Sequence, residues 1–318
     1  MKKGLIVFAI ILILAGGALF WGVFASLGYD YNKLSTAKAE TNTYTAEGEF
    51  TKIKIDTKST DVNLVPSEDG TLSVVCTELE KVKHSVTITD GVLNIVAEDN
   101  REWFDYINFF WRNLTMTVYL PATQYESLVI GVKTGNVNVP AAFTFGTVGI
   151  AAGTGNVNCC ASATGLLSIS ASTGNIKVES AHAAKAELLG STGNVKANSF
   201  VCDGDMEVRT STGDVYLTDV TCKNLNGKAS TGNIVLKNVI AAEKFTLRAS
   251  TGNIKFDRCD ATEIVAKTST GNITGTLRTP KMFVAGTGTG RVSVPNTVSQ
   301  NKCELTASTG DIRISIEE

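Results

Sequence analysis

The chain has 318 residues, and 29 basic residues against 31 acidic ones give it a formal net charge of −2, which argues against a polybasic nucleic-acid-binding protein. It has only two histidines, His84 and His182, and no Ser-His-Asp or Cys-His catalytic set can be assembled around either of them. The sequence also has no Cys/His spacing typical of a metal site. We therefore expect no catalytic, cofactor-binding or metal-binding residues.

The first predicted element is a helix in residues 4–28, an uncharged stretch that follows two lysines. As a helix this stretch would be about 37 Å long, enough to cross a bilayer. Residues 1–28 are therefore predicted to be a transmembrane anchor. Lysines on the short side predict a cytoplasmic N-terminus and an extracytoplasmic location for residues 30–318. The alternative is a signal peptide cleaved near Val23-Phe24-Ala25.

Beyond the anchor, residues 29–45 are polar and show no periodicity, which predicts a tether. Residues 46–130 are interpreted as one β-coil that carries an insertion between residues 66 and 112. Alternating apolar residues within the insertion flank Asp90-Gly91, a pattern that predicts a β-hairpin.

The insertion also contains a dense group of bulky side chains: Trp103, Phe104, Tyr106, Phe109, Phe110 and Trp111. An open end of a repeat array exposes core and an unpaired strand edge, and both must be covered. We expect this aromatic segment to act as a cap over the N-terminal end. The alternative is an interface with the membrane surface or with a partner protein.

A Thr-Gly repeat dominates residues 131–318. The dipeptide recurs every 19 or 20 residues, is followed by Asn in seven of ten cases, and is then always followed by Val or Ile. The ten glycines are Gly135, Gly155, Gly174, Gly193, Gly213, Gly232, Gly252, Gly271, Gly290 and Gly310. Apolar residues alternate with period two on both sides of each glycine, which predicts two short strands per repeat, each with one buried face.

Two architectures place a Thr-Gly-Asn corner between such strands: a hairpin meander and a β-solenoid. Only a solenoid, in which each coil pairs in parallel with the next, explains the fixed period and the same polar residue at every corner. We therefore predict an all-β, single-domain parallel β-solenoid with about 19–20 residues per coil, preceded by one transmembrane helix. The corner asparagines should stack about 4.8 Å apart and form a ladder of amide hydrogen bonds.

Seven cysteines are present, and Cys159 and Cys303 fall at core positions, as expected of buried thiols. Cys202 and Cys222 each follow a corner glycine by nine residues, so they should stack on adjacent coils within disulfide distance. We therefore hypothesise a disulfide between Cys202 and Cys222.

Four basic residues, each four positions before a corner glycine, should stack as a column on the solvent face: Arg209, Lys228, Arg248 and Lys267. Stacked like charges repel one another, and acidic neighbours such as Glu187 and Glu207 would ease that repulsion. The column is either an ordinary solvated face or a strip that binds a polyanion, such as a cell-wall polymer with repeating phosphates or carboxylates.

Several motifs together resemble the bacterial putative-adhesin family of membrane-anchored, β-strand-repeat envelope proteins. They are the first strand set at residues 50–55, the Val118-Tyr119-Leu120-Pro121 strand end, and the serial Ser-Thr-Gly-Asn/Asp-Val/Ile corners. The resemblance covers residues 45–318 and implies a β-solenoid at the cell surface, in a family whose domain function is largely undefined. Some members are linked to envelope-stress operons, and the family brings no catalytic residues. This chain departs from the pattern in its many cysteines and in Arg291, where Asn is usual.

The sequence therefore predicts a structural or adhesive rod of about eleven coils, roughly 50 Å long, without catalysis. Its expected partners are a membrane, through residues 4–28, and an envelope protein or an anionic cell-wall polymer. The polymer would bind along the basic column. A β-helix carbohydrate-active enzyme is a more distant alternative. Charges on the last coil, at Arg313, Glu317 and Glu318, should discourage end-to-end stacking of rods.

Overall fold

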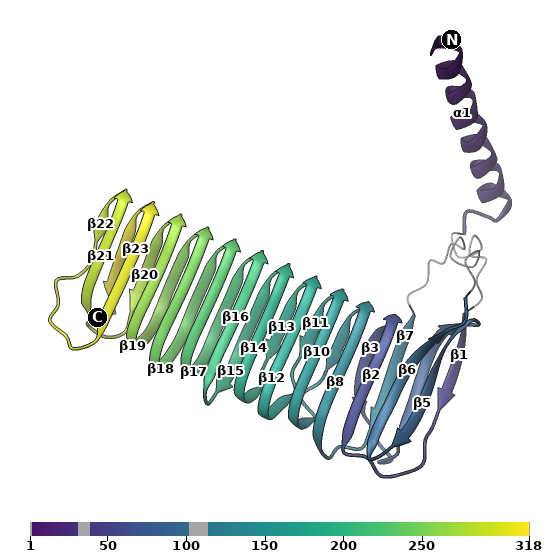
Figure 1. Cartoon of the computed structure of the whole chain (residues 1–318), viewed down its shortest axis with the longest axis horizontal. Coiled ribbons are helices and arrows are strands. Elements are labelled where there is room, and N and C mark those ends of the chain that lie inside the picture. Colours follow the sequence, from purple (N-terminus) through teal and green to yellow (C-terminus); the bar gives the residue numbers. More distant parts are fainter. Residues whose placement is uncertain (1, 31–38, 102–113, 318) are drawn as a thin grey trace.

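The structure, a computed structural model, describes residues 2–30, 39–101 and 114–317. It consists of one described helix and a 24-stranded sheet that winds into a straight rod, with the helix beyond one end (Figure 1). The predicted parallel β-solenoid with an N-terminal helix is confirmed. Within helix α1 (Lys2–Ser26), the segment Gly4–Ser26 has a mean hydropathy of 2.6, so it is long and apolar enough to cross a membrane.

The strands, in chain order, are β1 (Ala39–Tyr44), β2 (Lys52–Ser59), β3 (Asp61–Pro66), β4 (Ser73–Leu79), β5 (Val82–Thr89), β6 (Val92–Asp99), β7 (Thr115–Leu120), β8 (Gln124–Thr134), β9 (Val137–Val139), β10 (Thr144–Thr154), β11 (Val157–Cys159), β12 (Ser162–Thr173), β13 (Ile176–Glu179), β14 (His182–Thr192), β15 (Val195–Cys202), β16 (Asp205–Thr212), β17 (Val215–Thr231), β18 (Ile234–Thr251), β19 (Ile254–Thr270), β20 (Ile273–Leu277), β21 (Met282–Thr289), β22 (Val292–Ser293), β23 (Lys302–Thr309) and β24 (Ile312–Ile316).

Residues at the same phase of the repeat pair in register from coil to coil. Ile150 on β10, for example, lies between Ile130 on β8 and Ile169 on β12, and all three are buried. Because side chains alternate between the two faces of each strand, the same phases fill the interior of every coil. The result is one hydrophobic core that runs the length of the rod.

The corner residue after each glycine forms a ladder that differs in detail from the one predicted. The Asn136 Oδ1 atom accepts a hydrogen bond from the backbone N–H of Asn156 at 2.9 Å, in addition to a side-chain amide bond at 3.3 Å. Each rung therefore needs only an acceptor oxygen, and Asp214 fills that role at 2.7 Å from the N–H of Asn233. Arg291 offers no acceptor, and it lies at the end of the ladder, where its own N–H donates to Asp311.

The coils at both ends of the rod are stacked out of sequence order. Strand β23 lies between β19 and β21, and β24 lies between β20 and β22, so the last coil in the chain is the second to last in space. At the other end, β2 lies between β6 and β8, and β3 lies between β7 and β9. Both chain-terminal coils are therefore held between neighbours.

This order overturns the expectation that Arg313 and Glu317 protect an open end. Arg313 lies on β24, which is paired on both sides. The outermost strand is β21, which has no charged residue, and its Met282 and Val284 side chains are 46% and 51% exposed. Among the described residues β21 pairs with β23 alone, so the end of the rod that is farther from α1 is an apolar strand edge with one side unpaired (Figure 1).

The N-terminal insertion contains the predicted hairpin. Strands β5 and β6 pair antiparallel, and both turn residues, Asp90 and Gly91, have positive φ, as the commonest two-residue hairpin turn requires. The tether prediction for residues 29–45 is wrong in its last part, because Ala39–Tyr44 form β1, which pairs antiparallel with β4. The aromatic segment from Trp103 to Trp111 lies outside the described residues.

All seven cysteines are free thiols, and Cys202 and Cys222 are both buried. The two residues follow the register pair Val201–Thr221 on adjacent strands, so they are stacked as the sequence indicated. The structure nevertheless does not contain the hypothesised disulfide.

Replacing a corner glycine with alanine should destabilise the solenoid. Gly213 has φ of +136°, and an added Cβ would lie 2.1 Å from the carbonyl oxygen of Gly193. Because that obstacle is backbone held by the ladder, we expect Gly213→Ala to lower the free energy of unfolding by about 2–4 kcal/mol. Urea denaturation of the full chain in detergent, followed by circular dichroism, measures the change.

Gly149→Ala is the matched control, because an added Cβ there meets no atom within 4 Å. We expect it to be neutral or to stabilise the chain by about 0.5–1 kcal/mol. Equal losses in the two variants would contradict the role assigned to the corner.

Candidate functional site

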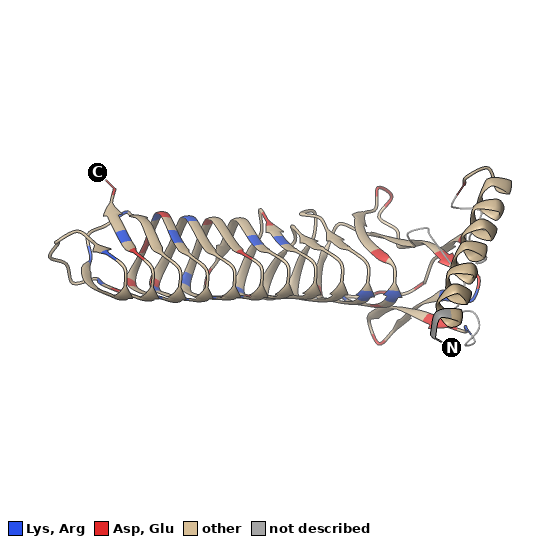
Figure 2. Ribbon diagram, turned by 90° about the horizontal axis from the view of Figure 1, so that it is seen from above, with Lys and Arg blue, Asp and Glu red and all other residues tan. Residues whose placement is uncertain are grey.

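The predicted basic column is present as a geometric feature. Arg209 is paired in register with Lys228, which is paired with Arg248. Lys267 continues the column on β19. Figure 2 shows basic residues spread along the C-terminal half of the rod, with acidic ones among them.

Acidic neighbours compensate only the two ends of the column. Arg209 forms an ion pair with Glu207, and the Lys267 ammonium lies 2.7 Å from a Glu304 carboxylate oxygen. Lys228 and Arg248 have no ion-pair partner among the described residues. The two middle positions of the column therefore present uncompensated positive charge.

A shallow depression of about 390 Å³ lies beside the column on the same face. Its charged lining is mixed, since Lys185 and Lys244 are balanced by Asp205 and Glu207. The depression therefore adds no further positive potential, and the column remains the cationic feature of this face.

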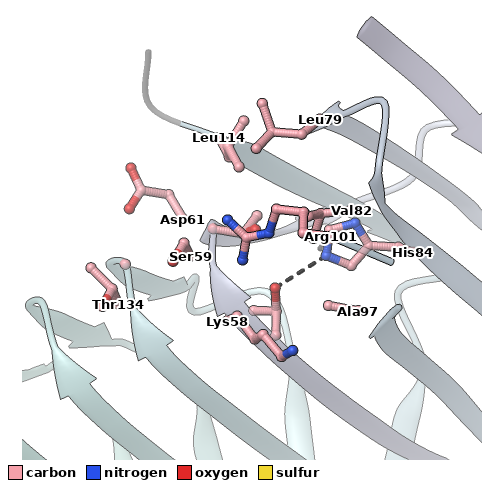
Figure 3. A pocket seen from close by; sticks show the side chains of 13 residues that line it. Lys58, Ser59, Asp61, Leu79, Val82, His84, Ala97, Arg101, Leu114 and Thr134 are labelled. Carbon is pink, nitrogen blue, oxygen red and sulfur yellow. Dashed lines mark hydrogen bonds between the residues drawn. The ribbon is translucent and has the colours of Figure 1, made fainter. Parts of the chain in front are cut away.

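A second candidate site lies near the N-terminal end of the rod, where the insertion packs against the first coil. A pocket of about 310 Å³ is lined there by residues that include Thr57, Lys58, His84 and Arg101 (Figure 3). The dashed line in Figure 3 is a 3.1 Å hydrogen bond between the His84 Nε2 atom and the Thr57 hydroxyl.

Behind this pocket, His84 belongs to a buried polar network. Its Nδ1 atom lies 2.7 Å from the Glu78 Oε2 atom, and its backbone N–H donates to the same oxygen at 2.9 Å. The other carboxylate oxygen, Oε1, accepts from the Asn42 amide at 2.8 Å and from the Tyr44 hydroxyl. Four donors thus surround a carboxylate whose residue is fully buried.

The pKa values of the network follow from this arrangement. Burial raises the pKa of Glu78, but the hydrogen bonds from Tyr44, Asn42 and His84 outweigh it, so the pKa lies below its ordinary value. Burial and the bond to Glu78 raise the pKa of Tyr44. Glu78 is therefore ionised at neutral pH, and Tyr44 acts as a neutral donor.

The carboxylate–imidazole–hydroxyl order of Glu78, His84 and Thr57 is that of a hydrolytic triad. Thr57 is only 1% exposed, however, so its hydroxyl is not presented to a substrate. A hydrolytic site also needs an oxyanion-stabilising group beside an accessible nucleophile. We therefore interpret the network as a structural element of the insertion.

No site role was predicted for His84 from the sequence, and neither Cys76 nor Glu78 stood out there. The three come together only because β4 and β5 are joined by a tight connection and pair antiparallel at Leu79 and Val82. One signal was available: Cys76 and Glu78 continue the buried phase of Val74 on β4, where an acidic residue is unexpected.

The stacked coils and their repeated glycine corners define the chain as a β-solenoid protein, with a single described apolar helix. It belongs to the Toastrack family (DUF4097), whose profile matches residues 50–206 and 201–318. A putative adhesin from Parabacteroides distasonis ATCC 8503 has 17% identity and a TM-score of 0.50, covering 88% of this chain and 98% of that one. No curated protein matches the chain.

Two other solved structures are more distant in shape. A putative adhesin from Bacteroides fragilis NCTC 9343 has 18% identity and a TM-score of 0.40, with 87% of this chain and 97% of that chain covered. A putative lipid binding protein from Parabacteroides distasonis ATCC 8503 has 15% identity and a TM-score of 0.39, with 89% and 98% covered. The family match confirms the resemblance drawn from the corner motifs.

Removing the Thr57 hydroxyl should destabilise the N-terminal part of the structure. Thr57→Val keeps the shape of the side chain but leaves the Nε2 atom of His84 buried without its partner. We expect the free energy of unfolding to fall by about 1–3 kcal/mol. Thr41→Val, an isosteric change at an exposed position of β1, should stay within about 0.5 kcal/mol of the parent in the same urea titration. A Thr57→Val variant as stable as the parent would refute the network's structural role.

Proposed function

We propose that this protein is a membrane-anchored, extracytoplasmic β-solenoid with a structural and adhesive role at the bacterial cell envelope, without catalysis. The observation that carries the proposal is that the two ends of the rod differ. An apolar, exposed helix of membrane-spanning length lies beyond one end, and an open apolar strand edge lies at the other. Such a rod would hold its far tip away from the membrane to which it is anchored.

Rigidity along the axis supports this role. Every described corner from Asn136 to Asp311 is tied to a neighbouring coil by backbone bonds and by the side-chain ladder. A chain that is hydrogen-bonded at each coil resists bending better than a flexible linker of the same length does. Stiffness of this kind is what a spacer or a surface-displayed adhesin needs.

The far tip supports the adhesive part of the proposal. Strand β21 presents unpaired backbone groups on one side together with exposed apolar side chains. Soluble proteins usually blunt such edges with charge or proline, because an open edge pairs readily with other strands. The solved neighbours described as putative adhesins are consistent with this role.

Location is tested with a single cysteine placed in the exposed loop between β22 and β23. We expect Asn296→Cys to react with a membrane-impermeant maleimide in intact spheroplasts, because that loop belongs to the extracytoplasmic rod. A cysteine placed before the helix, Lys2→Cys, should react only after the membrane is permeabilised. The parent chain, whose cysteines are largely buried, reports the background labelling.

Labelling of Asn296→Cys only after permeabilisation would place the rod in the cytoplasm and refute the proposal. A rod released from the membrane and shortened at its N-terminus would show instead that the helix is a cleaved signal peptide. The mass of the mature chain separates these outcomes.

A second function is favoured by the uncompensated middle of the basic column. Lys228 and Arg248 are adjacent in register on β17 and β18 and have no ion-pair partner among the described residues. Cations repeated along a straight face match a polymer with regularly spaced phosphates or carboxylates. Binding of an anionic cell-wall polymer is therefore the alternative that we propose.

Polymer binding is tested by co-sedimentation of the detergent-solubilised full chain with isolated cell-wall sacculi across a salt series. We expect binding to weaken as salt rises, because exposed charges are screened. Reversing the column with Arg209→Glu, Lys228→Glu, Arg248→Glu and Lys267→Glu should weaken binding by about tenfold or more.

The matched control carries the same change of net charge outside the column: Lys177→Glu, Lys196→Glu, Lys237→Glu and Lys255→Glu. It should retain most of the binding if the column is the site. Equal loss in both quadruple variants would indicate a response to net charge alone. Absence of binding in the parent chain would eliminate the polymer function.

A further inference from the structure

We propose that Cys76, Glu78 and His84 form a binding site for a divalent transition metal, best matched by zinc, inside the N-terminal insertion. A thiolate, an imidazole and a carboxylate are the three ligand types that zinc takes in proteins. The site would join β4 to β5 and stabilise the part of the rod that departs from the repeat.

The backbone positions the three residues together. Cys76 and Glu78 are two apart on β4 and so project from the same face, and His84 faces them from β5. One ligand atom from each residue lies within 4.8 Å of the other two. Bonds of about 2.0–2.3 Å would set tetrahedral zinc ligands roughly 3.3–3.8 Å apart, so side-chain adjustments of about an ångström bring the three ligands into place, and a water molecule would take the fourth position.

The groups that hold these ligands resemble the outer shell of a metal site. The Thr57 hydroxyl engages the Nε2 atom of His84, which leaves the Nδ1 atom facing Glu78. Asn42 and Tyr44 engage Oε1 of Glu78, which leaves Oε2 facing the histidine. Metal-binding histidines and carboxylates are commonly oriented in this way through the atom that does not bind the metal.

The thiol supplies an independent observation. Cys76 is fully buried and, like the buried Cys222 and Cys303, has no hydrogen-bond partner among the described residues; of these three thiols, Cys76 is the one that lies beside a carboxylate and an imidazole. An ionised carboxylate buried beside it is costly, and well-packed apolar residues would serve stability as well or better. A bound cation would interact favourably with both the thiol and the carboxylate.

Zinc binds cysteine as the thiolate, so binding of the metal to Cys76 would release the thiol proton. Of the three proposed ligands, His84 lines the neighbouring pocket, whereas Cys76 and Glu78 lie behind it and are fully buried.

The test uses the chelator-treated full chain in detergent, titrated with Co²⁺ as a spectroscopic substitute for zinc. We expect one equivalent to bind with a sulfur-to-cobalt charge-transfer band and the visible bands of tetrahedral cobalt, all removed by added Zn²⁺. Cys76→Ser should lose the charge-transfer band, and Cys159→Ser, a buried cysteine of the regular coils, should retain it.

Thr57→Val keeps all three ligands and changes only a group that orients His84. We expect it to retain the charge-transfer band but to bind about tenfold more weakly. Absence of a charge-transfer band in the parent chain, or its persistence in Cys76→Ser, would overturn the proposal. Because the test reads metal binding alone, it does not depend on the adhesive role.

Discussion

The close approach of successive corners is the constraint on which the rest of the structure depends. At Gly155 a Cβ atom would lie 2.0 Å from the carbonyl oxygen of Gly135, so the chain can turn there only with glycine, at positive φ. The turn leaves the next backbone N–H without a strand partner, and the side chain one coil away accepts it. Glycine and the acceptor residue that follows it therefore act as one unit, which recurs once per coil, every 19 or 20 residues.

That unit also explains why the two ends of the rod differ from its middle. An acceptor is needed wherever another coil follows, so Asn and Asp interchange inside the ladder, and arginine is tolerated only on the outermost coil at position 291. Both chain-terminal coils are held between neighbours, which protects the ends of the array from fraying. The consequence is that internal segments, β6 with β7 and β21 with β22, form the outer coils.

Periodicity in the sequence was sufficient for the solenoid, its register and the basic column, because each depends only on the phase of a residue within the repeat. It could not predict the order of the coils, since coils with identical phases stack equally well on one another. Arg291 departs from the repeat in the sequence, but only the ladder geometry shows that it lies on the outermost coil. The network around Glu78 was missed for a different reason: its members come from β1, β2, β4 and β5, and antiparallel pairing within the insertion brings them together.

Repetition itself limits where specific chemistry can arise in such a protein. A residue on the regular coils acquires similar neighbours above and below, so the rod readily builds columns of like groups, as at Arg209 to Lys267. A cluster of different groups around one point, such as Cys76, Glu78 and His84, needs strands that break the repeat. The insertion is the part of the described chain where antiparallel strands do so. The regular coils thus set the length of the rod, whereas the proposed metal site lies in the insertion.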